Sequence, residues 1–260
     1  MDRRRVIYYR NELEEEHSLA RIAPRRIDGS YRYLRDRPLE MGVRAMLRPL
    51  ALLSAYLYPR VVFGHRVEGR ERLAPYFGEA YFIYGNHTQD IADALIPSIL
   101  APKKEIYVIA HPSNVSIPVI GRITPYLGAL PLPDDKDARE NFKSAIDRII
   151  SDGGAIAIYP EAHIWPYYTG IRPFTDDSFY YPVKYGVPAF CFTNTYQRGR
   201  FSRAPNMVTY IDGPFFADLA LPYRSRRKDL RDRIYAKMCE RARLSTAERI
   251  KYVRIVDTDD

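Results

Sequence analysis

The stretch Tyr81-Phe-Ile-Tyr-Gly-Asn-His-Thr-Gln-Asp-Ile-Ala-Asp93 holds a strand, its exit and the approach to a helix. Tyr81 to Tyr84 form an aromatic and β-branched run, which is typical of a buried strand. Gly85 then permits a sharp turn. The polar pair Asn86 and His87 follows at the carboxyl end of the strand, in front of a helical segment. Open α/β proteins tend to place chemistry at such a position, so this stretch is the candidate site.

Two aspartates, Asp90 and Asp93, come soon after His87. Either carboxylate could hold one ring nitrogen so that the other nitrogen acts as a base near neutral pH. Asp90 also suits a helix N-cap, where its carboxylate would accept hydrogen bonds from free N–H groups. The sequence therefore predicts a histidine base and leaves its carboxylate partner open.

Strand-like and helix-like segments alternate around this stretch from Val61 onward. The expected strands are 61–64, 81–84, 105–110, 129–131, 155–159, 189–192 and 208–213. The expected helices are 92–100, 138–151, 179–185 and 226–243. This order predicts an α/β fold, with a mixed, mostly parallel central sheet flanked by helices, in one domain spanning residues 61–260.

Residues 1–60 are expected to form an N-terminal helical appendage that contacts a membrane. Its first part, 1–37, is an arginine-rich arm with one short helix and no evident chemistry. In its second part apolar residues recur at helical spacing among arginines and tyrosines, at Met46, Leu47, Leu50, Leu53 and Leu57. Such a helix fits a lipid interface, and the alternative is a helix that packs on the domain's own core.

Composition points to a basic protein that meets an anionic partner. The net charge is +8, which suits nucleic acid, acidic lipid or an acidic carrier. Aromatic-basic RNA-binding signatures are absent, so nucleic acid is not expected. The two cysteines lack metal-like spacing, which favours a reducing compartment. No secretory signal is visible, and the longest apolar stretch, 49–59, is about half of the ~20 residues that a bilayer crossing needs.

Several blocks of sequence now permit a comparison with a known family. They are Val67–Leu73, Gly85–Asp93, Ile120–Leu132, Ile158–Glu161, Ile171–Phe174 and Gly186–Pro188. Their order and spacing, over about residues 61–220, resemble the glycerol-phosphate and lysophosphatidic acid acyltransferase superfamily. The resemblance implies a transferase of phospholipid biosynthesis, similar to 1-acylglycerol-3-phosphate O-acyltransferases.

What the resemblance implies can be stated residue by residue. His87 would be the general base and Asp93 the aspartate that orients it, while Glu161 would help to hold the acceptor. Asn86 is a further substrate-binding candidate. The acyl donor would be a thioester of coenzyme A or acyl carrier protein, and the acceptor a glycerol-phosphate or lysophospholipid hydroxyl. No other cofactor and no metal is expected. The enzyme would lie on anionic lipid at the cytoplasmic face of a membrane, without a spanning helix.

The chain departs from the family pattern at three points. The family places four residues between its histidine and aspartate, whereas five separate His87 from Asp93 and two separate His87 from Asp90. A one-residue insertion favours Asp93. The arginine that usually follows the second block is replaced by Leu132 and an acidic stretch, and the arginine of the third block is missing from Glu161-Ala-His-Ile164. Candidate replacements for the two phosphate-pairing arginines are Arg122, Lys143, Arg172 and Lys184.

Other readings remain open at this stage. His163, next to the expected acceptor glutamate, is either a second site residue or a polar residue at a turn. Trp165 either walls an acyl pocket or belongs to the core. A metal-dependent hydrolase could use His87, Asp90, Asp93, Glu161 and His163 as ligands. A non-catalytic basic module that binds anionic membranes is the remaining alternative.

Overall fold

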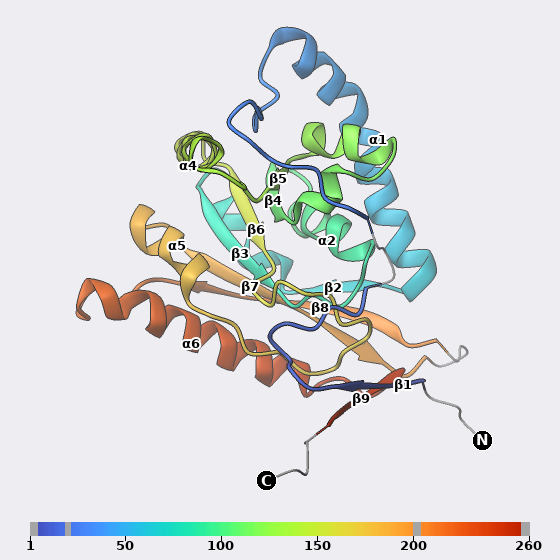
Figure 1. Cartoon of the computed structure of the whole chain (residues 1–260). Helices are drawn as coiled ribbons and strands as arrows, with labels where there is room; N and C mark the ends of the chain where they lie inside the picture. Colours follow the sequence, from blue (N-terminus) through green and yellow to red (C-terminus); the bar gives the residue numbers. More distant parts are fainter. Residues whose placement is uncertain (1–4, 19–21, 200–203, 256–260) are drawn as a thin grey trace.

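The computed structural model of this protein describes residues 5–18, 22–199 and 204–255. The strands are β1 Arg5–Tyr9, β2 Arg66–Glu68, β3 Tyr81–Gly85, β4 Ile106–Ala110, β5 Ala129–Pro131, β6 Ala155–Ile158, β7 Ala189–Gln197, β8 Asn206–Phe215 and β9 Ile250–Arg254. The α-helices are α1 Pro38–Phe63, α2 Ala92–Leu100, α3 Ile120–Ile123, α4 Lys136–Ser151, α5 Tyr180–Tyr185 and α6 Tyr223–Ala242. Figure 1 shows how these elements are arranged.

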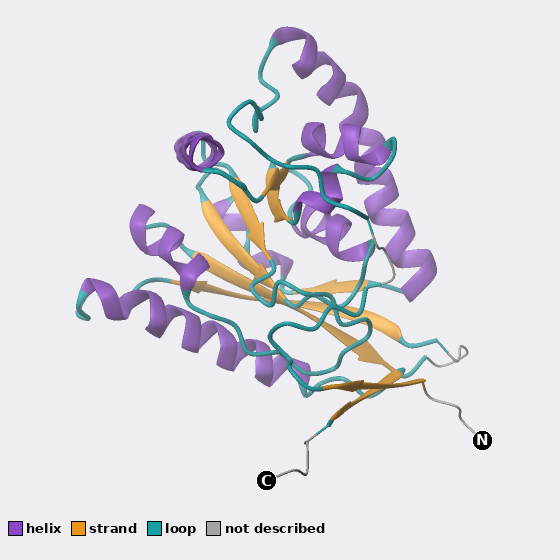
Figure 2. Ribbon diagram, in the orientation of Figure 1, coloured by secondary structure: helices purple, strands orange, loops and turns teal. Residues whose placement is uncertain are grey.

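Seven strands form the central sheet in the order β2-β8-β7-β3-β6-β4-β5. All neighbours are parallel except β7 and β8, which pair antiparallel. Helices lie on both sides of this sheet (Figure 2). The predicted α/β class with a mixed, mostly parallel sheet is therefore confirmed. Because β3 lies in the middle, the loop that follows it leaves the sheet at its centre.

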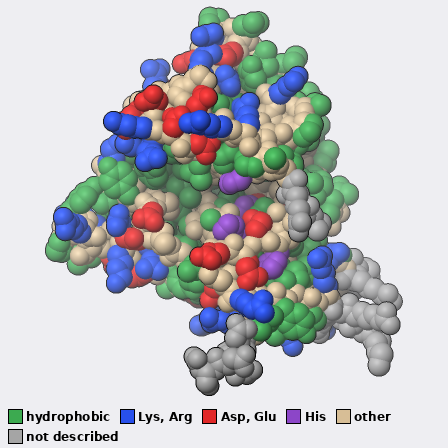
Figure 3. All heavy atoms as spheres, viewed as in Figure 1, with side chains coloured by type: hydrophobic (Ala, Val, Ile, Leu, Met, Phe, Trp, Pro, Cys, Tyr) green, Lys and Arg blue, Asp and Glu red, His purple; other side chains and the backbone are tan. Residues whose placement is uncertain are grey.

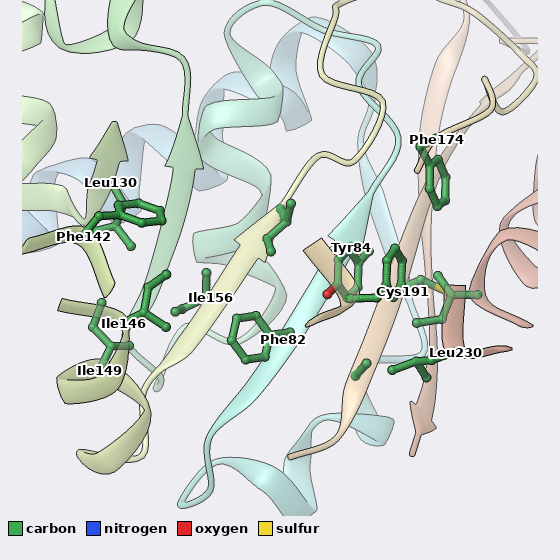
Figure 4. Packing of buried hydrophobic residues seen from close by; sticks show 14 of the residues in the cluster. Phe82, Tyr84, Leu130, Phe142, Ile146, Ile149, Ile156, Phe174, Cys191 and Leu230 are labelled. Atoms are coloured by element: carbon green, nitrogen blue, oxygen red, sulfur yellow. The ribbon is translucent and has the colours of Figure 1, made fainter. Parts of the chain in front are cut away.

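The sheet is buried on both faces, which explains why β3 has a continuous apolar sequence instead of an alternating one. On one face of the sheet, Phe82 and Tyr84 of β3 lie in a cluster with residues of α4, α5 and α6, among them Phe142 and Leu230 (Figure 4). On the other face, Tyr81 and Ile83 of β3 lie in a cluster with residues of α1 and α2, among them Phe63 and Ile96. Both layers hold the central strands in place beneath the candidate site.

The expected strand at 61–64 is wrong, because α1 continues to Phe63. The β-branched pair Val61 and Val62 suggested a strand, yet these residues form the last turn of a long helix. Gly64 ends α1 in the left-handed conformation, with φ 54°, and its N–H donates to the carbonyl of Pro59. The strand of this region comes just afterwards, as the short edge strand β2.

The N-terminal arm also differs from its prediction. Within residues 5–18 and 22–37 the structure has no helix. Instead β1 pairs in parallel with β9, so the two ends of the described chain form a small second sheet (Figure 1). Farther on, Ile27 and Tyr33 are buried in the main core. The arm is thus part of the packed molecule, and the domain boundary at residue 60 stays a prediction.

Gly85 serves close packing and not the turn that the sequence suggested. It is the last residue of β3 and pairs with Phe192 of β7. A Cβ atom placed on Gly85 would lie 2.1 Å from Cζ of the Phe192 ring. The ring is fully buried, so it cannot swing into solvent. Glycine therefore lets β3 and β7 approach each other immediately before His87.

We expect Gly85→Ala to lower the free energy of unfolding by about 1–3 kcal/mol, because the added methyl group overpacks a rigid core. Urea denaturation measures this change. Gly42→Ala is the matched control. Gly42 lies in α1, and a Cβ atom placed on it would meet no neighbouring atom within 4 Å, so alanine there should be neutral or stabilise by up to about 1 kcal/mol. Equal stability of the two variants would contradict the packing argument.

Candidate active site

His87 and Asp93 form the centre of the candidate site. Nδ1 of His87 lies 2.8 Å from Oδ2 of Asp93. The carboxylate can only accept, so Nδ1 donates to it, and Nε2 carries the free lone pair when the ring is neutral. Asp93 is fully buried, whereas the His87 side chain keeps 18% of its surface exposed. The ring therefore connects a buried anion to the surface.

The turn between β3 and α2 folds around the Asp93 carboxylate. Oδ2 also accepts from the backbone N–H groups of Thr88 and Gln89, at 2.7 and 2.8 Å. Oδ1 accepts from the side-chain amide of Asn194 in β7, at 3.2 Å. Asp93 lies in the first turn of α2, where the helix dipole stabilises a negative charge. These donors fix the carboxylate and hence the orientation of His87.

The His87 ring also rests on an aromatic neighbour. It stacks on Tyr159, with ring centroids 4.5 Å apart. The Tyr159 hydroxyl donates to the backbone carbonyl of Asp93, and burial raises the pKa of this phenol well above its usual range. Tyr159 thus stays a neutral donor and ties the loop after β6 to the start of α2.

Glu161, the expected acceptor ligand, is a buried support for the His87 loop. Its Oε2 accepts from the His87 N–H at 3.1 Å and from the Arg172 guanidinium at 3.3 Å. Its Oε1 accepts from the Arg172 N–H at 3.0 Å. Burial raises the pKa of Glu161, while the Arg172 charge and these N–H groups act in the opposite direction. The Glu161 side chain is only 1% exposed.

Arg172 and Asn86 are buried as well, which argues against the direct substrate contacts predicted for them. The Arg172 side chain has no exposed surface and also donates to the carbonyls of Glu12 and His163. Asn86 is 1% exposed. Its amide bonds to both backbone groups of Asn194, at 3.0 and 2.7 Å, and so links the end of β3 to β7.

The chain ends hold the loop that covers the His87 turn. The backbone N–H of Trp165 donates to the His87 carbonyl at 3.1 Å, and its indole N–H donates to the Glu15 carbonyl at 2.7 Å. Trp165 is fully buried and stacks on Tyr252 of β9 at 4.8 Å. It is therefore a core residue and not the wall of an acyl pocket. The N-terminal arm, in which the sequence showed no evident chemistry, therefore holds this loop against the candidate site.

The remaining candidates lie nearer the surface. Arg122 is exposed in α3. The His163 side chain is 35% exposed, and its Nδ1 lies 3.5 Å from a carboxylate oxygen of Glu16 in the arm. Of the two candidate aspartates, Asp93 is the one whose carboxylate contacts Nδ1 of His87. Figure 3 shows histidine side chains at the middle of one face, beside acidic side chains.

This geometry bears on two kinds of ligand, a metal ion and a substrate oxygen. Among the described residues, no group of three or more His, Cys, Asp or Glu side chains is arranged to hold a metal ion. The metal-dependent hydrolase is therefore not supported. In addition, the N–H groups of His87, Thr88 and Gln89 are already bonded to Glu161 and Asp93, so this turn does not offer them to a substrate oxygen.

Sequence reasoning missed Asn194, which bonds to both Asn86 and Asp93. The strand containing it was expected to end at residue 192, yet β7 runs to Gln197. The run Thr193-Asn194-Thr195 is polar and fully or almost fully buried. A polar run that continues an apolar strand was the available signal. The contacts of the chain ends had no such signal, because they depend on long-range pairing.

Comparisons with known proteins give the family and the fold of the chain. A family model described as "Acyltransferase" matches residues 64–193, which is half of the chain. A search of curated protein sequences finds no match. Among solved structures, the chain is similar to the 1-acyl-sn-glycerophosphate (LPA) acyltransferase PlsC from Thermotoga maritima. The TM-score is 0.57 at 20% identity, covering 82% of this chain and 86% of that one. At this identity the likeness shows the fold alone.

A second solved structure gives no further information. It is a mitochondrial ATP synthase assembly from Euglena gracilis, with a TM-score of 0.20 at 9% identity. The match covers 81% of this chain and 70% of that one. A score this low carries no argument about fold or function.

We expect Glu161→Gln to lower the free energy of unfolding by about 3 kcal/mol or more. The change leaves the Arg172 charge buried without its counter-ion. Urea denaturation measures the loss. Glu140→Gln, which removes an exposed carboxylate paired with Lys143 on α4, is the matched control and should change stability by less than about 1 kcal/mol. A Glu161→Gln variant as stable as the control would show that the pair does not support the loop.

Proposed function

The chain belongs to the acyltransferase family, and we propose that it moves a fatty acyl group from an acyl thioester to a hydroxyl of a glycerol-phosphate or lysophospholipid. The observation that carries this proposal is the hydrogen bond between His87 and the buried carboxylate of Asp93. A hydroxyl is a poor nucleophile until a positioned base removes its proton during attack. In this proposal Nε2, the ring nitrogen of His87 that does not contact Asp93, is that base.

The reaction follows from the two ring nitrogens. Nε2 of His87 accepts the proton of the acceptor hydroxyl as the oxygen attacks the thioester carbonyl carbon. The ring then carries a positive charge, which the Asp93 carboxylate stabilises through Nδ1–H. When the tetrahedral intermediate collapses, the carbon–sulfur bond breaks, and Nε2 returns the proton to the leaving thiolate. No covalent enzyme intermediate is required.

Around this pair we assign supporting roles to the other buried residues. Glu161, through its bonds to the His87 N–H and to Arg172, positions the catalytic loop. Asn86 holds the same loop to β7. None of these three side chains is exposed enough to contact a substrate directly. Contacts from Arg122 and His163 to the acceptor stay predictions.

We further propose that α1 holds the enzyme on a membrane surface. No described helix is long and apolar enough to cross a bilayer. One face of α1 packs on the domain through Ala55, Pro59 and Phe63. Another part of its surface is apolar and exposed, with Met46 at 64%, Leu50 at 61%, Leu53 at 54% and Leu57 at 45%. The packed side of α1 fits the interpretation of a helix that packs on the core. The exposed apolar side fits the interpretation of a helix at a lipid interface.

Chemistry and composition also support a proposal for the acyl donor and for the side of the membrane on which the enzyme lies. Coenzyme A and acyl carrier protein both present thioesters and both are anionic, which suits a chain of net charge +8. Cys191 and Cys239 are both free, which fits the reducing cytoplasmic side of a membrane. The alternative of a non-catalytic basic module gains no support, because it assigns no role to the His87–Asp93 pair.

We expect His87→Ala to lower kcat/KM for acyl transfer from an acyl-coenzyme A to lysophosphatidic acid by about 10²–10⁴-fold, the usual range for losing a general base. Asp93→Asn should lower it by about 10²-fold or more, because an amide no longer stabilises the protonated ring. Steady-state kinetics on purified protein measures both losses.

Asp90→Asn is the matched control for Asp93→Asn, since it neutralises the other candidate carboxylate. We expect this variant to keep kcat/KM within about threefold of wild type. Circular dichroism and thermal melting verify that each variant is folded. A folded His87→Ala enzyme with activity within a few-fold of wild type, or an Asp90→Asn variant as impaired as Asp93→Asn, would refute the assignment.

For the membrane contact, we expect the triple variant Leu50→Gln, Leu53→Gln and Leu57→Gln to bind vesicles of mixed neutral and anionic lipid at least about tenfold more weakly. Each leucine side chain moved from water to an apolar environment contributes about 1.5–3 kcal/mol when fully buried. Vesicle sedimentation measures the partition. The control variant carries Phe216→Gln, Leu219→Gln and Leu244→Gln, which are exposed elsewhere. Equal weakening of both variants would overturn the role of α1.

A further inference from the structure

The arginine-bearing segment before α1 is fixed at the ends of two strands. The Arg25 N–H donates to the hydroxyl of Ser116 at 2.9 Å. The Ile27 N–H donates to the Asp134 carboxylate at 2.6 Å, and the Asp134 N–H donates back to the Ile27 carbonyl at 3.0 Å. Ile27 itself is fully buried. Arg25 and Arg26 are therefore held beside the loops that follow β4 and β5.

These loops lie on the same edge of the sheet as His87. Strands β3, β6, β4 and β5 are parallel neighbours in that order, so their carboxyl ends lie in one row. Neighbouring strands are about 4.8 Å apart. The end of β4 is two strands from the end of β3, and the end of β5 is three strands away. The ends of β4 and β5 are thus roughly 10–14 Å from the end of β3 along this edge.

An open hollow of about 590 Å³ lies at this place. Its lining includes Pro24, Arg25, Arg26, His111, Leu132 and Asp134. A second hollow, of about 300 Å³, shares Arg25 and Arg26 and continues toward Tyr31 and Arg35. Sites for small molecules usually measure about 300–1,000 Å³, so the space is large enough for a phosphorylated group.

Carboxylates pair with three of the four arginines around the hollows, and Asp28 also lines the smaller hollow. Arg32 and Arg35 are paired with Glu40, at 3.0 and 3.6 Å. The Asp134 carboxylate is partly engaged by the Ile27 N–H. The Arg26 side chain is 73% exposed, with Asp135 at 3.6 Å. Arg25 is exposed, and its guanidinium lies over the Tyr31 ring, 5.3 Å from the centroid.

We propose that Arg25 and Arg26 form a phosphate-binding subsite for one of the two substrates, an inference that rests on the proposed acyl transfer. A guanidinium group can donate two parallel hydrogen bonds to a phosphate, in a bidentate arrangement. Leu132 lines the same hollow, and the residues from Leu132 to Asp135 after β5 include no lysine or arginine. Both arginines precede the residues 64–193 matched by the family model. The N-terminal segment thus supplies the charge that the loop after β5 lacks.

The phosphate has two possible sources, the acceptor or the phosphopantetheine of the donor. The double variant Arg25→Gln, Arg26→Gln distinguishes these two sources. It is assayed in neutral detergent micelles, where attraction to an anionic lipid surface plays no part. KM and kcat are measured with lysophosphatidic acid against monoacylglycerol as acceptor, and with acyl-coenzyme A and acyl carrier protein as donors. The control, Arg224→Gln with Lys228→Gln on α6, removes the same charge from another exposed surface.

We expect KM to rise at least about tenfold for the substrate whose phosphate binds here, the effect of losing charge-assisted hydrogen bonds. The kcat should stay within about threefold, and the control should match wild type. A rise for lysophosphatidic acid but not for monoacylglycerol identifies the acceptor. A rise for the donors identifies phosphopantetheine. Unchanged KM for every phosphate-bearing substrate, or an equal rise in the control, overturns the subsite.

Calorimetry with inorganic pyrophosphate tests the subsite without turnover. Wild type should bind this probe at least about tenfold more tightly than the double arginine variant, while the control binds as wild type does. Equal affinity of wild type and the arginine variant, or no binding by either, overturns the subsite. If wild-type protein transfers no acyl group to any acceptor, the proposed function fails separately, and the calorimetric result then decides on phosphate binding alone.

Discussion

The Asp93 carboxylate, in the first turn of α2, accepts hydrogen bonds from the turn after β3 and from strand β7. A buried carboxylate is costly unless donors surround it, and here they come from His87, Thr88, Gln89 and Asn194. Satisfying one anion therefore fixes the path of the turn. The catalytic ring acquires its orientation as a consequence, because it is one of the required donors.

A second buried charge extends this constraint to the ends of the chain. Glu161 bonds to the His87 N–H, and its counter-ion Arg172 bonds to the carbonyls of Glu12 and His163. The arm must cover Arg172 to exclude water, and β9 pairs with β1 to hold that arm. Residues more than 150 positions apart in the sequence, such as Glu12 and Arg172, thus act on one loop. This coupling makes the termini part of the site.

The sequence predicted the central features because they are local. The aromatic run of β3, the short spacing from His87 to Asp93 and the apolar face of α4 all lie within a few turns of chain. The failures were of two kinds. Val61 and Val62 have strand propensity, yet the packing of α1 overrode it. Asn194 and β1 depend on partners far along the chain, which no local pattern reveals. Likewise, Gly85 suggested a turn, although a distant ring, Phe192, explains it.

The order of segments also relates the lipid surface to the chemistry. The arginine segment leads directly into α1, which begins at Pro38. The Arg32–Glu40 ion pair, at 3.0 Å, ties the two together across the helix start. If the exposed face of α1 lies on lipid, the same covalent connection holds Arg25 and Arg26 near the headgroup region, where phosphates are concentrated. Membrane contact and phosphate recognition then depend on one continuous stretch of chain, anchored by Ile27 to the sheet edge that carries His87.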